Sequence, residues 1–289
     1  MEIIVAKSAG FCFGVDLAIK KVESLISEAK ENDDKHPIYT YGPIIHNPSV
    51  VSKLENQGVQ IIDHLEEIKF KEKGTILIRS HGVSEDEVDL MKKSGFELED
   101  CTCPYVKKIH RIVRRDSLNG CDVIIVGDHK HPEIKGIAGW VKTKTYFIET
   151  LEDVDNLHLD PTKHYSIVAQ TTFNNQLYED ILNKLQKKSI HVIINETICS
   201  ATMERQIEAK ELSQKVTKMI VIGGRNSSNT RKLYEICKSQ CKDTYYIETI
   251  EDLVLNVFTV NDIIGITAGA SAPKNIIEEV ISNVRNVEF

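Results

Sequence analysis

The chain of 289 residues contains no apolar run of the roughly 18 residues that a membrane-spanning helix requires. Its first seven residues also lack the basic start and the long apolar stretch of a secretory signal. We therefore expect a cytoplasmic protein with no membrane partner. A basic excess is lacking too, since the net charge is −7, and this argues against a nucleic-acid partner. An anionic substrate would have to be bound by local groups, because the overall field repels it.

The chain also lacks a long linker rich in Pro, Gly or Ser and any low-complexity segment. Its content of 41% hydrophobic and 27% charged residues is typical of a soluble globular protein. The length fits two or three small domains, which should then pack tightly around a shared centre. Cysteine, by contrast, occurs seven times. In a reducing compartment, this favours metal-binding or catalytic thiols over disulfides.

Three of the cysteines occupy matching places in a sequence repeat. Each stands directly before a run with helical periodicity: Cys12 before Phe13–Ile19, Cys103 before Pro104–Ile109, and Cys199 before Ser200–Gln206. After each run come an apolar strand that ends in Gly and a polar loop, and a second strand and loop close each third of the chain. The first strands and loops are Ile38–Gly42 with His46-Asn47, Val123–Gly127 with His131-Pro132-Glu133, and Met219–Gly223 with Asn226–Asn229. The closing loops are Arg79–Gly82, Gln170–Thr172 and Gly269–Ser271.

This self-similarity predicts three pseudo-equivalent copies of one small α/β domain, at residues 1–98, 99–195 and 196–289. Strands that alternate with helices predict mostly parallel sheets flanked by helices. Ligands of such sheets bind beyond the carboxyl ends of the strands, where all six polar loops are predicted to lie. Three thiols on three equivalent helix starts can then meet on one axis.

The three repeat-related cysteines are suited to a metal site. A helix N-terminus favours a thiolate, and Pro104 suits the first helical position, which places Cys103 near the N-cap. Three thiolates around an iron–sulfur cluster would leave one iron without a protein ligand, so that it can act as a Lewis acid. The alternative is a small buried hydrophobic side chain, which we prefer for Cys121, Cys237 and Cys241. Cys101 lies two residues from Cys103, and its side chain should diverge from it.

The polar loops resemble a diphosphate pocket built from neutral donors and imidazoles rather than lysines. Ser227–Thr230 precedes a helical run, so its amides and hydroxyls can bind an oxyanion. A histidine near neutral pH can carry charge to a phosphate or pass a proton. Ordinary helix caps and turn residues are the alternative. Glu133 is the only carboxylate within these motifs, which favours an acid–base role over that of a surface residue at a helix start.

Nine motifs carry a resemblance to a known family. They are Ala9–Val15, Ile45–Asn47, Arg79–Val83, Thr102–Pro104, His131–Glu133, Gln170–Thr172, Cys199, Asn226–Thr230 and Ala268–Ser271. In this order they resemble the motifs of the 4-hydroxy-3-methylbut-2-enyl diphosphate reductases, the last enzymes of the methylerythritol phosphate route to isoprenoids. The resemblance extends from residue 9 to residue 273, which is essentially the whole chain.

The resemblance implies a trefoil of three α/β domains around a [4Fe–4S] cluster. Cys12, Cys103 and Cys199 would hold the cluster, and its open iron would bind the substrate hydroxyl. The diphosphate would be held by His46, His81, Ser227, Ser228, Asn229 and Ser271. Glu133, with Thr171 and His131 nearby, would deliver protons to the leaving hydroxyl. Two electrons and two protons would then remove water and give isopentenyl and dimethylallyl diphosphates.

The helix after Cys103 suggests where electrons enter. Its basic residues fall on one side, opposite its apolar ones: Lys107, Lys108, Arg111, Arg114 and Arg115 against Ile109, Ile112 and Val113. Such a face could dock a reduced, acidic ferredoxin or flavodoxin. A solvated helix face is the alternative.

Two other functions use the same residues. In a zinc hydrolase, the three cysteines would bind zinc and activate a water for phosphate cleavage. A non-catalytic sensor would bind a phosphorylated ligand or a cluster and would not need Glu133. Neither accounts for the whole series of motifs.

Overall fold

The computed structural model describes residues 1–33 and 35–287, and the chain forms two compact units. Unit 1 comprises Met1–Val15, His46–Val50 and Cys199–Phe289, and unit 2 comprises Asp16–Ile45 and Val51–Ile198. The division into domains at residues 98 and 195 stays a prediction. Within the described residues, no helix is both long and apolar enough to cross a bilayer.

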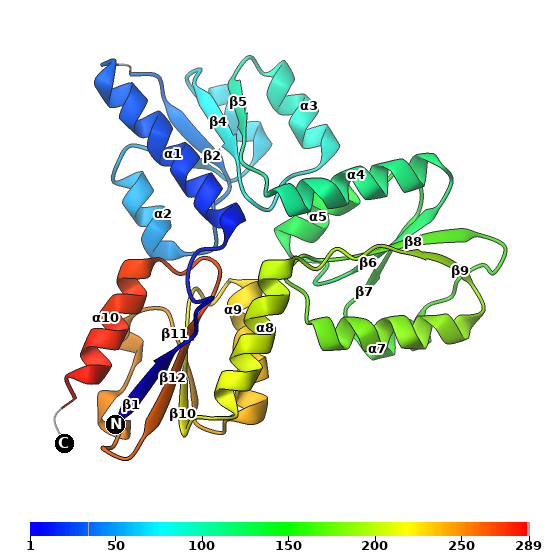
Figure 1. The fold of residues 1–289 in the computed structure, drawn as a ribbon. Helices are drawn as coiled ribbons and strands as arrows, with labels where there is room; N and C mark the ends of the chain where they lie inside the picture. The colour runs from blue at the N-terminus through cyan, green and yellow to red at the C-terminus, as the bar shows by residue number, and fades with distance from the viewer. Residues whose placement is uncertain (34, 288–289) are drawn as a thin grey trace. The chain divides into compact units, whose positions relative to one another are not determined.

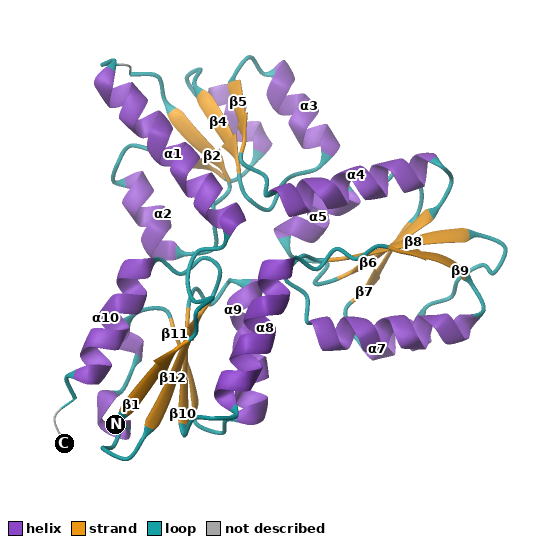
Figure 2. Ribbon diagram, viewed as in Figure 1, coloured by secondary structure: helices purple, strands orange, loops and turns teal. Residues whose placement is uncertain are grey.

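Three four-stranded sheets, each entirely parallel, carry the fold (Figures 1 and 2). This confirms the predicted α/β class with three parallel sheets flanked by helices. The first sheet consists of β2 to β5, lies in unit 2 and has the order β3-β2-β4-β5. Its strands are β2 (Ile38–Tyr41), β3 (Gln60–Ile62), β4 (Thr75–Ile78) and β5 (Glu97–Asp100). The helices of this stretch are α1 (Phe13–Glu31), α2 (Pro48–Glu55), η1 (Leu65–Phe70) and α3 (Glu85–Lys93).

The second sheet, also in unit 2, has the order β7-β6-β8-β9. Its strands are β6 (Asp122–Val126), β7 (Thr145–Ile148), β8 (His164–Ala169) and β9 (His191–Ile194). The accompanying helices are α4 (Pro104–Leu118), α5 (Pro132–Ala138), α6 (Leu151–Asn156), α7 (Asn175–Leu185) and η2 (Gln186–Lys188). Successive residues of β6 alternate between two cores, because Val123 and Ile125 pack with α4 and α5, whereas Ile124 and Val126 pack with α7.

The third sheet belongs to unit 1 and has the order β1-β12-β10-β11. Its strands are β10 (Lys218–Ile222), β11 (Thr244–Ile247), β12 (Ile263–Ala268) and β1 (Glu2–Val5). The helices are α8 (Ser200–Ser213), α9 (Ser228–Gln240), η3 (Ile250–Asp252), η4 (Leu255–Val257) and α10 (Lys274–Arg285). In Figure 1, α8 and α9 lie on one side of this sheet and α10 on the other. The N-terminal strand β1 thus takes the edge position that β5 and β9 hold in the other two sheets.

The three sheets share one topology, which creates three equivalent crevices. In each sheet, the chain runs from an inner strand to the edge strand on one side and then returns to form the strand on the other side of the first. The crevices therefore lie between β2 and β4, between β6 and β8, and between β10 and β12. Ligands bind at such switch points, beyond the carboxyl ends of the strands. All six polar loops follow these inner strands, so the structure confirms their predicted place.

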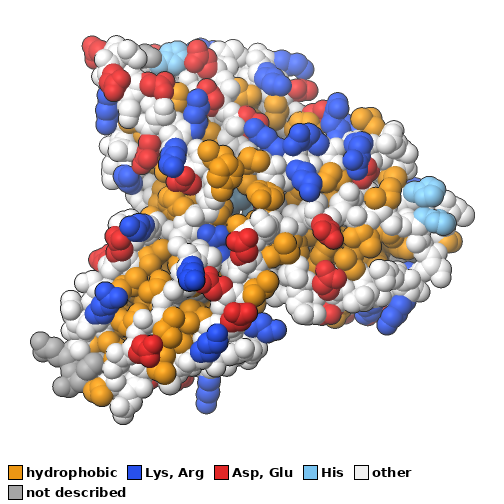
Figure 3. All heavy atoms as spheres, viewed as in Figure 1, with side chains coloured by type: hydrophobic (Ala, Val, Ile, Leu, Met, Phe, Trp, Pro, Cys, Tyr) orange, Lys and Arg blue, Asp and Glu red, His pale blue; other side chains and the backbone are white. Residues whose placement is uncertain are grey.

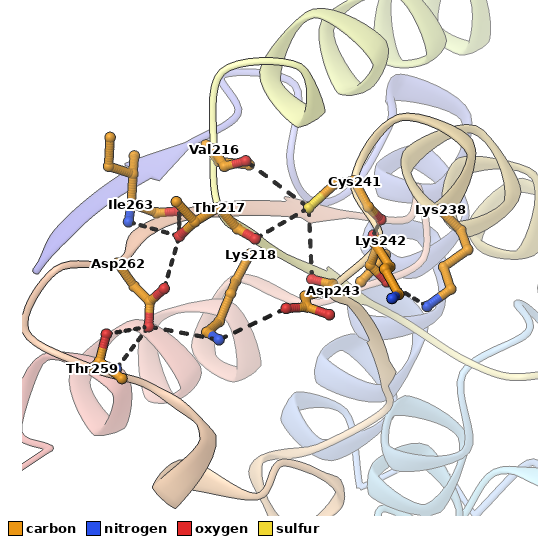
Figure 4. Close-up of polar contacts among 11 residues, drawn as sticks. Val216, Thr217, Lys218, Lys238, Cys241, Lys242, Asp243, Thr259, Asp262 and Ile263 are labelled. Atoms are coloured by element: carbon orange, nitrogen blue, oxygen red, sulfur yellow. Dashed lines mark hydrogen bonds and ion pairs between the residues drawn. The ribbon is translucent and has the colours of Figure 1, made fainter.

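The opposite, amino-terminal end of the unit 1 sheet is closed by a polar network (Figure 4). Asp262 accepts hydrogen bonds from the Thr217 hydroxyl at 2.8 Å and from the Thr259 amide at 2.7 Å, and it lies 3.7 Å from the Lys218 ammonium. Nearby, the buried Cys241 thiol faces the carbonyl oxygen of Thr217 at 3.5 Å. Cys241 is therefore part of the core packing at the end remote from the polar loops.

Replacing Asp262 by Ala should destabilise the protein by about 2 kcal/mol, because it removes hydrogen bonds to a buried carboxylate. Burial alone would raise the pKa of the Asp262 carboxyl, but hydrogen bonds from Thr217 and Thr259 outweigh it and hold the pKa below its usual value. The stabilisation is therefore complete above about pH 4 and is lost as the pH falls through the lowered folded pKa. Denaturant unfolding near neutral pH measures the loss. The exposed Asp243, 3.9 Å from the same Lys218, is the matched control and should change stability by less than about 0.5 kcal/mol when replaced by Ala.

Candidate functional site

The crevice of the second sheet holds a buried carboxyl. Glu133 lies in the first turn of α5 and is only 2% exposed. Its two oxygens accept hydrogen bonds from Thr171, which follows β8: the amide at 2.6 Å and the hydroxyl at 2.9 Å. Glu133 is therefore at a helix start, as one alternative had it, but it is not on the surface.

Burial raises the pKa of Glu133 to about 7, against the lowering effect of the two hydrogen bonds from Thr171. A carboxyl with such a pKa exchanges protons near neutral pH, which is what a general acid requires. Gly127 contributes to the close packing around it, because a Cβ at this position would lie 2.7 Å from the Ile134 side chain. The structure therefore joins Glu133 and Thr171, which the family resemblance implies to be neighbours.

Two imidazoles of unit 2, those of His81 and His131, are in contact with each other. His131 is the N-cap of α5, and its Nδ1 accepts the amide hydrogen of Glu133 at 3.1 Å. Because Nδ1 is an acceptor, the neutral ring carries its proton on Nε2. The ring of His81, from the loop after β4, packs edge-on against that of His131 with centroids 5.4 Å apart. Loops of the first two sheets thus bring both predicted histidines together.

Cys103 and Cys101 have different surroundings. Cys103 is the N-cap of α4 with Pro104 at the first helical position, as predicted, and its amide donates to the Ser80 carbonyl at 2.9 Å. Cys101 continues β5, where its amide donates to the Ile78 carbonyl at 3.1 Å. Burial and the nearby charges of Asp100 and Glu99 raise the pKa of the Cys101 thiol to about 12. This supports Cys103 as the metal ligand, because the ligand is a thiolate.

Unit 1 contains the other two candidate ligands. Cys199 is the N-cap of α8, with its sulfur 3.0 Å from the Thr202 hydroxyl. The amide of Cys12 donates to the carbonyl of Ala270, in the loop after β12, at 3.2 Å. Neither thiol forms a disulfide with a described residue, and both are half-buried. A helix N-terminus therefore follows each of Cys12, Cys103 and Cys199, as predicted.

A buried arginine accompanies the two cysteines of unit 1. Arg205 is 5% exposed and donates to the Gly10 carbonyl at 2.7 Å, and its Nε has no hydrogen-bond partner among the described residues. Burial lowers the pKa of its guanidinium, while the charges of Cys12 and Cys199 act in the opposite direction. A buried cation beside two thiols calls for an anionic neighbour. The residues present thus fit an anionic thiolate-bound metal cluster.

The remaining polar residues of unit 1 gather at the switch point between β10 and β12. Ser227 is the N-cap of α9 and, with Ser228 and Asn229, is buried. The side-chain amide of Asn229 has no hydrogen-bond partner among the described residues. Together with the amides of the first turn of α9, this unused donor is suited to an anion.

Residues 46–50 add a third segment to this end of unit 1. The Ser271 hydroxyl donates to the His46 carbonyl at 3.2 Å, and the Asn47 side chain donates to the Ser271 carbonyl at 2.9 Å. Gly224, after β10, approaches the same His46 carbonyl so closely that a Cβ would lie 2.6 Å from it. The structure therefore brings His46 and Ser271 together beside the loop that leads to Ser227.

Arg205 was not among the residues that the sequence pointed to. Its signal lies in the periodicity of α8, where the buried positions Thr202, Arg205, Gln206 and Ala209 follow a helical spacing. A charged residue on such a face marks a buried charge that requires a partner.

Comparison with known proteins agrees with these features. The family profile described as LytB protein matches residues 3–285. A 4-hydroxy-3-methylbut-2-enyl diphosphate reductase of Clostridioides difficile is 44% identical over 287 residues, which cover 99% of this chain and 100% of that protein. The reductase of Aquifex aeolicus is 41% identical over 292 residues, covering 99% and 97%.

Solved structures show the same likeness. A structure of (E)-4-hydroxy-3-methyl-but-2-enyl diphosphate reductase, the terminal enzyme of the non-mevalonate pathway, matches with a TM-score of 0.71 and 40% identity over 99% of both chains. The reductase of Plasmodium falciparum matches with a TM-score of 0.91 and 29% identity, over 100% of this chain and 89% of that one.

Proposed function

Because this chain belongs to the LytB family, we propose that it catalyses the reaction for which its relatives are named, the reduction of 4-hydroxy-3-methylbut-2-enyl diphosphate. The substrate takes up two electrons and two protons, its C–O bond breaks, and water leaves. The products are isopentenyl and dimethylallyl diphosphates. The observation that carries the proposal is the buried Glu133–Thr171 pair at the switch point of the second sheet, in a chain that matches these reductases along its whole length.

We propose a [4Fe–4S] cluster held by Cys12, Cys103 and Cys199. Each thiol is half-buried beside a helix N-terminus, and Arg205 supplies a buried positive charge near two of them. When bound, the cluster supplies the electrons and an iron without a protein ligand that is a Lewis acid for the substrate hydroxyl. The arrangement of the three repeats around this shared centre remains a prediction.

The diphosphate is bound, in this proposal, by His46, His81, Ser227, Ser228, Asn229 and Ser271. The buried hydroxyls and amide at the start of α9 donate hydrogen bonds to its oxygens, and the helix dipole favours its charge. Neutral donors suit this task, because an anion surrounded by directed N–H and O–H groups needs no lysine. The net charge of −7 makes such local groups necessary.

Glu133 donates the proton that the leaving hydroxyl takes up as water. Thr171 fixes the carboxyl through both oxygens, and its hydroxyl can rotate to pass a hydrogen bond to the substrate. His131 orients the first turn of α5, because its Nδ1 accepts the amide hydrogen of Glu133. A reduced ferredoxin or flavodoxin supplies the electrons. We propose that the protein works in the cytoplasm.

The iron, sulfide and zinc content of protein purified without oxygen tests this function, together with Mössbauer spectra with and without 4-hydroxy-3-methylbut-2-enyl diphosphate. We expect four irons and four sulfides per chain, with one distinct iron whose signal changes when the diphosphate is added. Zinc without sulfide would instead support the hydrolase. A cluster indifferent to the diphosphate would support the sensor.

A further inference from the structure

The exposed side of α4 is a basic surface directly after Cys103. Lys108, Arg111, Arg114 and Arg115 are exposed, whereas Ile109 and Val113 are fully buried. Figure 3 shows Lys and Arg side chains gathered in the region of this helix. The structure therefore confirms the predicted separation of charged and apolar sides. On a chain with a net charge of −7, such a surface stands out as a local positive field.

Ion pairs neutralise part of this surface. Lys107 pairs with Asp100 at 2.7 Å, Arg114 with Glu85 at 2.9 Å, and Arg115 with Asp116 at 2.7 Å. Among the described residues, Lys108 and Arg111 form no ion pair. These two cations are therefore the ones best placed to attract an acidic partner.

The basic surface adjoins a pocket with a mainly apolar interior. This cavity of ≈ 340 Å³ lies between α3, α4 and the end of α5, and Val83, Val88 and Trp140 line it together with Lys107, Arg111 and Arg114. His110 also lines it and stacks on Trp140, with ring centroids 5.2 Å apart. Burial lowers the pKa of His110 to about 4, so that its ring is neutral at physiological pH. The pocket wall also contains the Asp100 carboxylate, which is paired with Lys107, so the pocket combines a mainly apolar interior with the excess positive charge of Arg111 and Arg114.

The pocket lies next to a proposed ligand of the cluster. Thr102, which also lines the pocket, directly precedes Cys103, and Cys103 is the N-cap of the helix that carries the basic surface. A protein seated here would therefore bring its redox group close to the Cys103 end of α4. Electron transfer needs such proximity, whereas substrate binding does not need this surface.

We propose that the basic surface of α4 and its apolar pocket form the docking site for an acidic one-electron donor protein, which inserts an apolar side chain into the pocket. The inference rests on the proposed function, because it supplies the need for electrons. Each encounter oxidises one reduced donor and transfers one electron, so two encounters supply the two electrons of one turnover. Charge complementarity steers the encounter, and the desolvated apolar contact holds the complex.

The double variant K108E/R111E tests the charge. With a reduced, acidic ferredoxin as donor, we expect kcat/KM for the ferredoxin to fall at least tenfold at low salt, and the difference to shrink near 1 M salt, where the Debye length is about 3 Å. Turnover with a small chemical reductant should be unchanged, which separates docking from the proposed function. K187E/K215E is the matched control, because it reverses two exposed lysines remote from α4 in the sequence. An equal loss in the control, or no loss in K108E/R111E, would overturn the proposal.

Val88→Trp tests the pocket without a change in charge. Val88 is half-buried at the pocket wall, so the larger ring should fill the space. We expect the KM for ferredoxin to rise, with little change in salt dependence and with full activity on the small reductant. An unchanged KM for ferredoxin in a variant that folds normally would exclude the pocket from docking.

Discussion

Glu133→Gln should lower turnover by about 100- to 10,000-fold, with little change in the KM for the diphosphate. The variant keeps the size of the side chain and can still accept a hydrogen bond from Thr171, but its amide has no acidic proton to transfer. The carboxyl is buried and is held through both of its oxygens, so its position is fixed by the fold. Steady-state rates with a chemical reductant measure the effect. An intact cluster spectrum in the variant is the control for a local change.

The pH dependence of the rate gives an independent test of the same residue. The donor must be protonated, and burial raises its pKa to about 7, so the wild-type rate should fall as the pH rises above about 7. Thr171→Val removes one hydrogen bond that lowers this pKa, so the fall should move to higher pH. The residual rate of Glu133→Gln should not show the fall at all. A fall at the same pH in that variant would assign the titration to another group.

The repeat itself was predictable from sequence because each copy carries its own local signals. Short apolar runs that end in Gly became β2, β6 and β10, and the polar loops followed them at the crevices. The partner of the N-terminal strand was not predictable in this way. Val5 pairs with Ile266, about 260 residues away, and no local pattern records which edge a strand will join. The copy that contains Cys199 therefore completes its sheet with a strand from the opposite end of the chain.

The candidate site likewise has features that local sequence predicts and features that depend on contacts between distant residues. The Cys-Pro pair was enough to place Cys103 at a helix N-cap, because Pro suits the first helical position. The burial of Glu133 was only one of two interpretations, since a carboxylate at a helix start is usually exposed. The hydrogen bonds from Thr171 settle that point. These hydrogen bonds join two residues that are 38 positions apart in the sequence, and a short motif does not show which distant residues come into contact.

Cys103→Ser should yield protein that loses most of its iron and sulfide and, with them, its activity. Cys101→Ser should keep both. The two thiols stand two residues apart, so the pair is a matched comparison in which only the local environment differs. Cys103 caps α4, where the helix dipole favours the thiolate form that binds metal. Cys101 lies in a setting that keeps its thiol protonated, because burial and two neighbouring carboxylates raise its pKa to about 12.

Iron and sulfide analysis and the visible absorption of anaerobically purified protein measure both variants. Cys237→Ser gives a third point, because this thiol is fully buried against α8 and should affect stability but not the iron content. Thermal unfolding of the metal-free proteins separates misfolding from loss of a ligand, since Cys103→Ser should unfold at nearly the wild-type temperature without metal. If Cys101→Ser instead lost the cluster while Cys103→Ser retained it, the ligand would be Cys101. The helix start would then not decide which thiol binds iron.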